Sequence, residues 1–250
     1  VICEINRHLP WCCGDDFKVH ISEIDYIIEN DNPLFELPEI PITDVENKLA
    51  EFIVDLIPDG ATIQLGFGGL GNAIGHMLHG KKDLGMHSEV VTPSVTELVK
   101  AGVLTCSNKN FYPGKIITAF AVGTKQFYDD LNRNELFEFK EVHWVNQPMN
   151  IAQNDNLISI NNTLMIDLTG QAASESIGTK QYSGTGGQVN FNQGAKMSRG
   201  GKRILALAST YTDKDGKLKS KLLPTLPEGS IVTTSRNEQE YLVTEFGVVN

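Results

Sequence analysis

Apolar residues recur at helical spacing in some segments of the chain and form short unbroken runs in others. The segment after Thr43 shows the first pattern most clearly, and Thr43 with Glu46 matches the capping box that begins many helices. Helical spacing then places these apolar residues on one face: Val45, Leu49, Phe52, Ile53 and Leu56. We therefore predict a helix that begins after Thr43 and ends before Pro58.

The rest of the chain continues this alternation. Further helices are predicted over about 72–79, 94–101 and 124–131. A second capping box, Ser94 with Glu97, begins the middle one. Unbroken apolar runs predict strands at ATIQL, HSEVV, IITAFAV, VHWVN, LISI, RILALAS and YLVTEFGVV. This alternation indicates an α/β fold with a mostly parallel sheet and helices on both faces, and glycine-rich loops are expected beyond Leu164.

The first 42 residues do not follow this alternation. Residues 1–25 hold two strand-like runs, VICEI and FKVHISEID, on either side of a polar turn. Residues 26–42 contain three prolines among acidic residues, and proline disfavours helix in the residue before it. We therefore expect a domain remnant over 1–25, a linker over 26–42 and a second domain over 43–250. Both ends fall in strand-like segments, so we expect the protein to continue on both sides.

The composition is that of a globular chain, and its negative charge argues against some classes of binding partner. Hydrophobic residues make up 40% of the 250 residues, which is enough for a sizeable core. The net charge of −10 argues against nucleic acid and anionic membrane surfaces as partners, because both attract basic proteins. No apolar run approaches the roughly 18 residues that a membrane helix needs. An anionic ligand would have to be held by local dipoles and a few placed basic side chains.

The cysteines and histidines predict neither a disulfide framework nor a metal site. None of the four cysteines forms a C-x-x-C pair, which is typical of reduced thiols in the cytoplasm. His76 and His79 lie at helical spacing that can bind zinc, but no third ligand is near them in sequence. We expect exposed histidines at a helix end and no metal.

A glycine-rich turn follows the predicted strand ATIQL. Its sequence GFGGLG, residues 66–71, matches the G-x-G-x-x-G pattern of dinucleotide-binding turns. Glycines let the backbone approach a phosphate, and the following helix supplies N–H donors and the positive end of its dipole. The alternative is a tight strand-to-helix turn that needs glycine for its backbone conformation.

Glu89 lies on the next predicted strand. In a dinucleotide site it would be the acid that binds a ribose hydroxyl about 20 residues beyond the glycine turn. A carboxylate is also ionised at neutral pH, so it can act as a nucleophile without a general base. On composition alone, a solvated glutamate at a strand end is the simplest interpretation.

A second glycine-rich segment covers SGTGGQV, residues 183–189. Successive backbone N–H groups there could form an anion-binding nest or an oxyanion hole, and the alternative is a flexible surface loop. Four basic residues follow, which could hold phosphates or simply form a solvated face: Lys196, Arg199, Lys202 and Arg203.

The chain resembles the acetyl-CoA hydrolase/transferase family from about residue 1 to residue 250, and within it the group that acts on 4-hydroxybutyrate, butyrate and acetate. The stretches that carry this resemblance are VHISEID, IQLGFGGLGNAIG, LGMHSEVV, VGTKQFYD, DLTGQAASESIGTKQYSGTGGQVNF and VTTSRNEQEYLVTEFG. The resemblance covers roughly the second half of a family member. It implies a C-terminal CoA-transferase domain of NagB-like fold that lacks its helical tail, after the last strands of an N-terminal domain.

The resemblance also implies roles for individual residues. Glu89 matches the catalytic glutamate, which attacks an acyl-CoA and becomes first an acyl anhydride and then a glutamyl-CoA thioester. Asn161 matches an asparagine near the active site. Gly186 and Gly187 match a loop that contacts CoA and supplies an oxyanion-hole N–H. The matching CoA-binding loop comprises Gly66, Phe67, Gly68, Gly69 and Leu70.

The function expected from this resemblance is transfer of CoA between an acyl-CoA and a short carboxylate. Acyl-CoA would be the substrate, with no metal, in a cytoplasmic homodimer. Two alternatives stay open from the residues. Entry of water would make the same site an acyl-CoA hydrolase, and the GxGxxG turn with Glu89 would suit a nicotinamide-dependent oxidoreductase. A third possibility is that this chain binds CoA weakly and catalyses nothing by itself.

Overall fold

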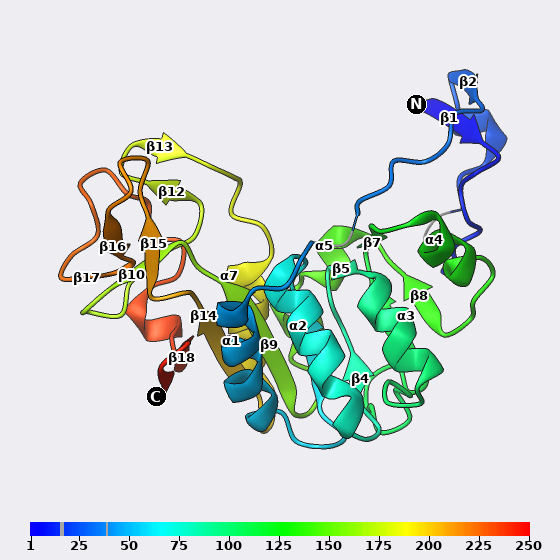
Figure 1. The fold of residues 1–250 in the computed structure, drawn as a ribbon. Coiled ribbons are helices and arrows are strands. Elements are labelled where there is room, and N and C mark those ends of the chain that lie inside the picture. Colours follow the sequence, from blue (N-terminus) through cyan, green and yellow to red (C-terminus); the bar gives the residue numbers. More distant parts are fainter. Residues whose placement is uncertain (16–17, 39) are drawn as a thin grey trace.

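A central sheet organises the protein, for which a computed structural model describes residues 1–15, 18–38 and 40–250. The six strands have the order β19-β18-β14-β9-β3-β4 (Figure 1). Their bounds, in that order, are Gly247–Val249, Tyr241–Thr244, Lys202–Ala206, Leu157–Asn162, Thr62–Leu65 and Gly85–Met86. Neighbouring strands are parallel except β18 and β19, which form an antiparallel hairpin. The expected α/β fold with a mostly parallel sheet is confirmed.

Two short parallel pairs lie beyond β4. In one, β5 (Val90–Val91) pairs with β7 (Phe120–Ala121), and in the other β6 (Ile116–Thr118) pairs with β8 (Phe137–Phe139). A single bridge between His87 and Ile117 connects β6 to the segment between β4 and β5. The predicted strand HSEVV is therefore interrupted, and Glu89 lies at the interruption.

Helices cover both faces of the sheet, as expected. On one face lie α1 (Asp44–Asp55), α2 (Gly69–Met77) and α3 (Pro93–Lys100), and α7 (Gln188–Met197) contacts β9 and β14 from the other (Figure 1). The shorter helices are η2 (Leu78–Gly80), α4 (Lys125–Leu131), α5 (Val142–Val145) and α6 (Pro148–Ile151).

Alternating residues of the central strands face these two helical layers. The side towards α1 and α2 carries six buried apolar residues of β3, β9 and β14: Ile63, Leu65, Ile158, Ile160, Ile204 and Ala206. The polar residues Lys202 and Asn162 stand only at the ends of β14 and β9 on this side, and Lys202 Nζ donates to the Leu56 carbonyl. The side towards α7 includes Gln64, Ser159 and Asn161, and Ser159 Oγ lies 3.3 Å from Asn192 Oδ1 of α7. Because helices cover both faces of the sheet, the strands appear in the sequence as mostly apolar runs with few polar positions.

Local capping explains where α1 begins. Thr43 Oγ1 accepts a hydrogen bond from the Glu46 N–H, and Glu46 Oε2 accepts one from the Thr43 N–H at 2.8 Å, so the predicted capping box is formed. The second predicted box is not. Thr92 is the N-cap of α3, Pro93 is its first residue, and Ser94 lies inside the helix. Proline suits the first helical position because it lacks an N–H. The helix therefore begins at Pro93, one residue before the predicted cap Ser94.

Three other expectations were wrong in type or position. The segment VHWVN is a helical turn, α5, because Trp144 stacks on the His87 ring there instead of lying along a sheet. The helix expected from residue 72 begins at Gly69. The strand expected over 17–25 lies instead at β2 (Tyr26–Asn30), within the expected linker, and η1 (Ile21–Glu23) precedes it; Phe17 of that run lies outside the described residues.

Small strand pairs and loops dominate the region beyond residue 164, as expected. Its elements are β10 (Met165–Asp167), β11 (Ala172–Ala173), β12 (Ser176–Ile177), β13 (Lys180–Gln181), β15 (Thr210–Thr212), β16 (Leu218–Ser220), β17 (Leu222–Leu223) and η3 (Arg236–Glu238). They lie at the opposite side of the sheet from β5 and β7 (Figure 1).

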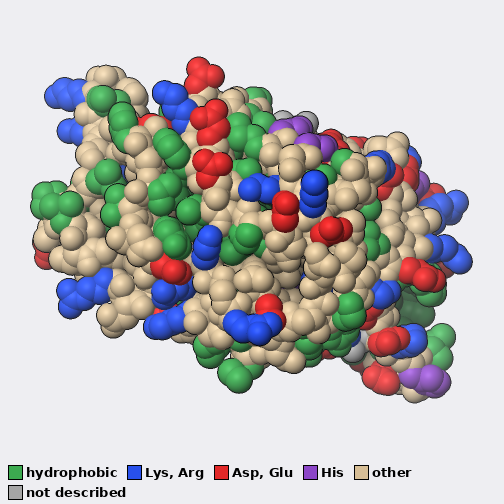
Figure 2. All heavy atoms as spheres, turned by 90° about the horizontal axis from the view of Figure 1, so that it is seen from below, with side chains coloured by type: hydrophobic (Ala, Val, Ile, Leu, Met, Phe, Trp, Pro, Cys, Tyr) green, Lys and Arg blue, Asp and Glu red, His purple; other side chains and the backbone are tan. Residues whose placement is uncertain are grey.

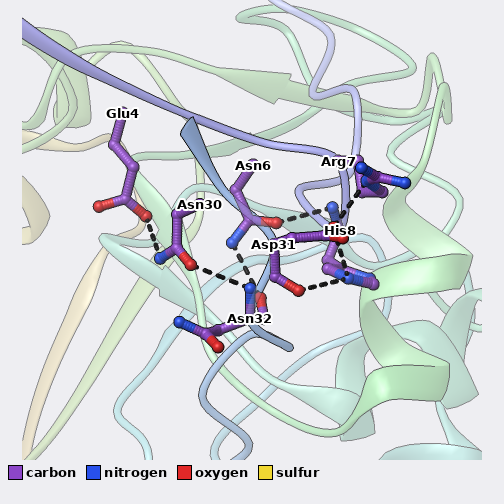
Figure 3. Close-up of polar contacts among 7 residues, drawn as sticks. All are labelled: Glu4, Asn6, Arg7, His8, Asn30, Asp31 and Asn32. Carbon is purple, nitrogen blue, oxygen red and sulfur yellow. Dashed lines mark hydrogen bonds and ion pairs between the residues drawn. The ribbon is translucent and has the colours of Figure 1, made fainter. Parts of the chain in front are cut away.

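The N-terminal segment forms its own two-stranded sheet, apart from the central one (Figure 1). There β1 (Ile2–Asn6) pairs in parallel with β2. Polar contacts join the strand ends, among them Asn30 Nδ2 to Glu4 Oε1 at 2.8 Å and Arg7 Nε to Asp31 Oδ1 at 2.6 Å (Figure 3). The division of the chain into two domains stays a prediction.

Acidic and basic side chains intermingle on the face shown in Figure 2, without a broad field of one sign. Among the described residues, no helix combines the length and the apolar character needed to cross a membrane.

Candidate active site

Glu89 is held by its main chain at the gap between β4 and β5. Its carbonyl oxygen accepts hydrogen bonds from Ala119 N at 3.0 Å, Phe120 N at 3.1 Å and Thr118 Oγ1 at 3.2 Å. These contacts hold the Glu89 main chain against residues 118–120, next to the paired strands β5 and β7. The Glu89 side chain is only partly exposed. It therefore does not project freely into solvent, as a simple strand-end glutamate would.

Gly187 lies directly against the Glu89 carboxylate. A Cβ atom at residue 187 would lie 2.3 Å from Glu89 Oε2, which is closer than any carbon–oxygen contact allows. The backbone of Gly187 is right-handed, with φ −87°, so a larger residue there would not strain the main chain but would displace the Glu89 carboxylate. The second glycine loop and Glu89, 98 positions apart in sequence (187 − 89), thus meet at the N-terminus of α7.

The N–H groups of Gly186 and Gly187 donate to no main-chain acceptor among the described residues. Gly187 stands against the carboxylate at the beginning of α7, where the helix dipole is positive, and Gly186 precedes it in the chain. Free N–H donors at such a position can bind a negative charge that develops on an oxygen next to Glu89. This geometry suits the anion-nest interpretation of the loop better than that of a flexible surface loop.

Asn146 contacts the same carboxylate and was missed by the sequence analysis. Its Nδ2 donates to Glu89 Oε2 at 2.9 Å, and its Oδ1 is buried without a hydrogen-bond partner among the described residues. Asn146 is the C-cap of α5. The predicted strand over VHWVN hid it, because its branched and aromatic residues favour a strand. The asparagine before Gln147-Pro148 was the available signal, since proline often follows a helix end.

The first glycine turn reaches the same edge of the sheet. Ser88 Oγ donates to Leu65 O at 3.0 Å, which joins the residue before Glu89 to the residue before Gly66. A Cβ atom at residue 71 would lie 2.2 Å from Gly66 O, so the turn closes only with glycine there. Within the turn, Gly66 and Gly68 border open space and the Phe67 side chain is 56% exposed, whereas Gly69 and Leu70 are buried at the start of α2.

Asn161 lies at the carboxyl end of β9, beside the strand that leads into this turn. Its side-chain amide pairs with that of Gln64, with Asn161 Nδ2 to Gln64 Oε1 at 3.1 Å and Gln64 Nε2 to Asn161 Oδ1 at 3.3 Å. Asn161 also donates to Ser159 Oγ at 3.0 Å. The structure thus places Asn161 at the same edge as the other predicted residues, but gives it no contact with Glu89.

The charged side chains near the two glycine loops offer few free partners for the phosphate groups of a ligand. The four basic residues beyond the second loop all have intramolecular partners: Lys196 with Glu238, Arg199 with Asp155, Lys202 with the Leu56 carbonyl and Arg203 with Glu240. They are not a free phosphate cluster. At the first turn, the Glu46 carboxylate packs on Gly69, where a Cβ atom would lie 2.1 Å from Oε1. An acid at this helix N-terminus repels a diphosphate, and CoA carries a diphosphate as a dinucleotide does, so this charge does not distinguish the two ligands.

Comparisons with known proteins point to one family. A family model described as the acetyl-CoA hydrolase/transferase C-terminal domain matches residues 123–250. The chain is 49% identical over 250 residues to 4-hydroxybutyrate coenzyme A transferase of Clostridium kluyveri. That match covers 100% of this chain and 57% of that protein. It is 44% identical to butyryl-CoA:acetate CoA-transferase of Anaerostipes caccae, with 57% of that protein covered. The chain thus spans little more than half the length of these relatives.

Solved structures show the same architecture. RipA from Yersinia pestis superimposes with a TM-score of 0.91 at 41% identity, over 100% of this chain and 56% of that one. A 4-hydroxybutyrate CoA-transferase from Porphyromonas gingivalis superimposes with a TM-score of 0.84 at 38% identity, over 99% of this chain and 57% of that one.

Proposed function

Because the chain belongs to the acetyl-CoA hydrolase/transferase family, we propose that it forms part of an enzyme that transfers CoA from an acyl-CoA to a short carboxylate. The observation that carries this proposal is the contact of Gly187 and Asn146 with the Glu89 carboxylate. A nucleophilic carboxylate with adjacent N–H donors is what attack on a thioester requires.

The reaction would proceed by exchange at the Glu89 carboxyl. One carboxylate oxygen attacks the thioester carbonyl carbon, the C–S bond breaks, and CoA leaves as a thiolate. The thiolate then attacks the glutamyl carbonyl of the anhydride, which releases the first carboxylic acid as its anion and leaves CoA on Glu89. An acceptor carboxylate takes the CoA by the same steps in reverse. No proton changes hands, so the site needs no general base.

The residues around Glu89 would stabilise the charge that moves in these steps. Each attack produces a tetrahedral oxyanion, and Gly187, whose N–H donates to no main-chain acceptor among the described residues, lies against the reacting carboxyl. One preorganised donor of this kind contributes about 3–4 kcal/mol to transition-state stabilisation. Asn146 Nδ2 orients Oε2 and leaves the other carboxylate oxygen as the nucleophile.

Short acids are the proposed acceptors. The relatives named above act, by their names, on 4-hydroxybutyrate, butyrate and acetate. Acyl groups that differ by one methylene are separated by only about 1–3 kcal/mol in a hydrophobic pocket, so several of these acids are expected to be used. Transfer, as opposed to hydrolysis, depends on exclusion of water from the anhydride and the thioester.

The first testable prediction concerns Glu89. Glu89→Gln, measured on the intact protein, should lower acyl-CoA:acetate CoA transfer by at least about 10³-fold, because an amide cannot form the anhydride. Borohydride added during turnover should convert the Glu89 carboxyl to an alcohol, detected by peptide mass spectrometry, only when acyl-CoA is present. Glu97→Gln, on the exposed face of α3, is the matched control and should keep full activity. Full activity of Glu89→Gln would refute the proposal.

A further inference from the structure

The His87 imidazole lies two residues before Glu89 and is completely buried. Both ring nitrogens have partners: Nε2 lies 2.8 Å from the Val145 carbonyl oxygen, and Nδ1 lies 3.1 Å from Asn154 Nδ2. A carbonyl can only accept, so Nε2 carries the proton and donates it to Val145. Asn154 Nδ2 also donates to the Ile151 carbonyl at 3.1 Å, which fixes the orientation of this amide. His87 is therefore a neutral donor and acceptor at once.

The hydrogen bond to Val145 ties together the two chain segments that meet at the Glu89 carboxylate. Val145 immediately precedes Asn146, whose Nδ2 donates to Glu89 Oε2 at 2.9 Å. The path from Glu89 through Asn146, Val145 and His87 back to Glu89 is thus a closed ring of covalent and hydrogen bonds. In such a ring two hydrogen bonds fix the position of the Asn146 amide relative to the carboxylate: its own bond to Glu89 and the bond of the preceding residue, Val145, to His87.

The helix that carries Asn146 cannot hold this position by itself. It is the single turn α5, Val142–Val145, and an isolated helical turn is unstable in water. Tertiary contacts must hold it, and the His87 ring supplies them in two ways. It bonds to the last carbonyl of the turn, and it stacks on Trp144 with ring planes 10° apart.

The same ring also contacts the helix that presents the second glycine loop. Phe191 meets the His87 ring edge to face at 6.0 Å, and the Phe191 N–H donates to the Gly187 carbonyl at 3.0 Å. His87 therefore packs against both elements that contact Glu89, namely α5 with Asn146 and α7 with Gly187. Burial lowers the pKa of His87 to about 3, so this arrangement stays uncharged throughout the neutral range.

We propose that His87, held by Asn154, is a positioning residue that keeps the Asn146 amide on the Glu89 carboxylate; the inference rests on the proposed CoA transfer at Glu89. His87 touches neither substrate nor the reacting atoms in this role. Its contribution is to catalysis through Asn146, so its loss should lower kcat and leave the binding of CoA largely unchanged.

The test compares two substitutions of His87 in the intact protein. His87→Phe keeps an aromatic ring between Trp144 and Phe191 but removes both hydrogen bonds, and should lower kcat about 10- to 100-fold, as loss of precise orientation does. His87→Gln restores a donor towards the Val145 carbonyl and should recover most of that loss, within about fivefold of the original kcat. KM for acyl-CoA should change by less than about threefold in both.

A control variant separates positioning from a general loss of stability. Ile53→Ala, in α1 on the apolar face, should lower the free energy of unfolding by a similar amount without changing kcat, because Ile53 is buried far from α5 in sequence and packs with α2. If His87→Phe and Ile53→Ala had equal kcat values at a temperature where both are folded, the proposal would be overturned.

A second readout does not depend on catalysis. The side-chain amide resonance of Asn146, observed in the ¹⁵N-labelled protein, should shift in Glu89→Gln and, in the same direction, in His87→Phe, and should return in His87→Gln. An unchanged Asn146 resonance in His87→Phe would contradict the positioning role. If Glu89→Gln proved active, CoA transfer at Glu89 would be wrong, and this resonance would still decide whether His87 positions Asn146.

Discussion

The two faces of the central sheet are built differently although they share the same strands. Towards α1 and α2 the middle of each strand presents buried aliphatic side chains, and polar residues stand only at strand ends. Towards α7 they present Gln64, Ser159 and Asn161, linked to one another by hydrogen bonds. The candidate active site lies on the α7 side, where Gly187 meets Glu89.

We infer from this difference that one face mainly stabilises the fold and the other mainly positions side chains. Aliphatic packing is non-directional, so it stabilises the layers without specifying where a single atom lies. Hydrogen bonds between buried amides are directional and specify one arrangement. A buried polar atom that finds no hydrogen-bond partner, however, destabilises the fold. On the α7 side such atoms do occur, among them Asn146 Oδ1 and Asn192 Nδ2. We expect the apolar face to dominate stability and the polar face to dominate activity.

The largest expected effect is on the apolar face and concerns stability. Ile158→Ala removes a fully buried side chain of β9 and should lower the free energy of unfolding by about 4 kcal/mol, from lost burial and the cavity left behind. Ser159→Ala, its neighbour on the other face, should lower it by only about 1–2 kcal/mol through loss of the Gln64 contact. Denaturant titration of both variants tests this, and equal losses would break the comparison.

The next effect is a pH dependence that comes from His87, whose ring packs against Phe191 of α7. The unfolded chain binds a proton at His87 below about pH 6.5, whereas the folded protein binds it only near pH 3. Stability from this residue is therefore complete above pH 6.5 and falls as the pH drops towards 3, by about 3 kcal/mol between pH 7 and pH 4.

His87→Gln isolates this contribution, because glutamine does not titrate. The unfolding free energy of the original protein minus that of His87→Gln, measured at intervals from pH 7 to pH 4, should decrease steadily. A difference that stays constant over that range would show that His87 becomes protonated without unfolding the protein.

The smallest of these effects in free energy is specific to activity. Gly187→Ala is compatible with the backbone, but its Cβ would displace the Glu89 carboxylate, so CoA transfer should fall about 100-fold with little loss of stability. Gly184→Ala lies in the same loop with open space around it and should be nearly neutral. Similar activities of the two variants would show that close approach at Gly187 is unimportant for the reaction.

Prediction from the sequence recovers most of the fold because the signals for its elements are local. The capping box at Thr43, the helical spacing after it and the aliphatic runs of β3, β9 and β14 each depend on a few neighbouring residues. It failed at VHWVN, where a strand-forming composition became a helical turn because the Trp144 ring stacks on His87, 57 positions earlier (144 − 87). A distant packing partner overrode local propensity there.

The candidate site divides in the same way. The two glycine loops were recognisable along the chain because glycine turns are local motifs, and Glu89 was singled out by the family resemblance. Their meeting point, and the parts played by Asn146, His87 and Asn154, were not.

By itself the sequence determined most of the alternation of helices and strands, the apolar face of the helix after Thr43 and the residue types that could react. Which of those residues touch was decided by tertiary structure alone. Hydrophobic periodicity is read within one element, whereas a hydrogen bond between a carboxylate and an amide 57 residues away (146 − 89) exists only after the strands have paired and both helical layers have closed over them.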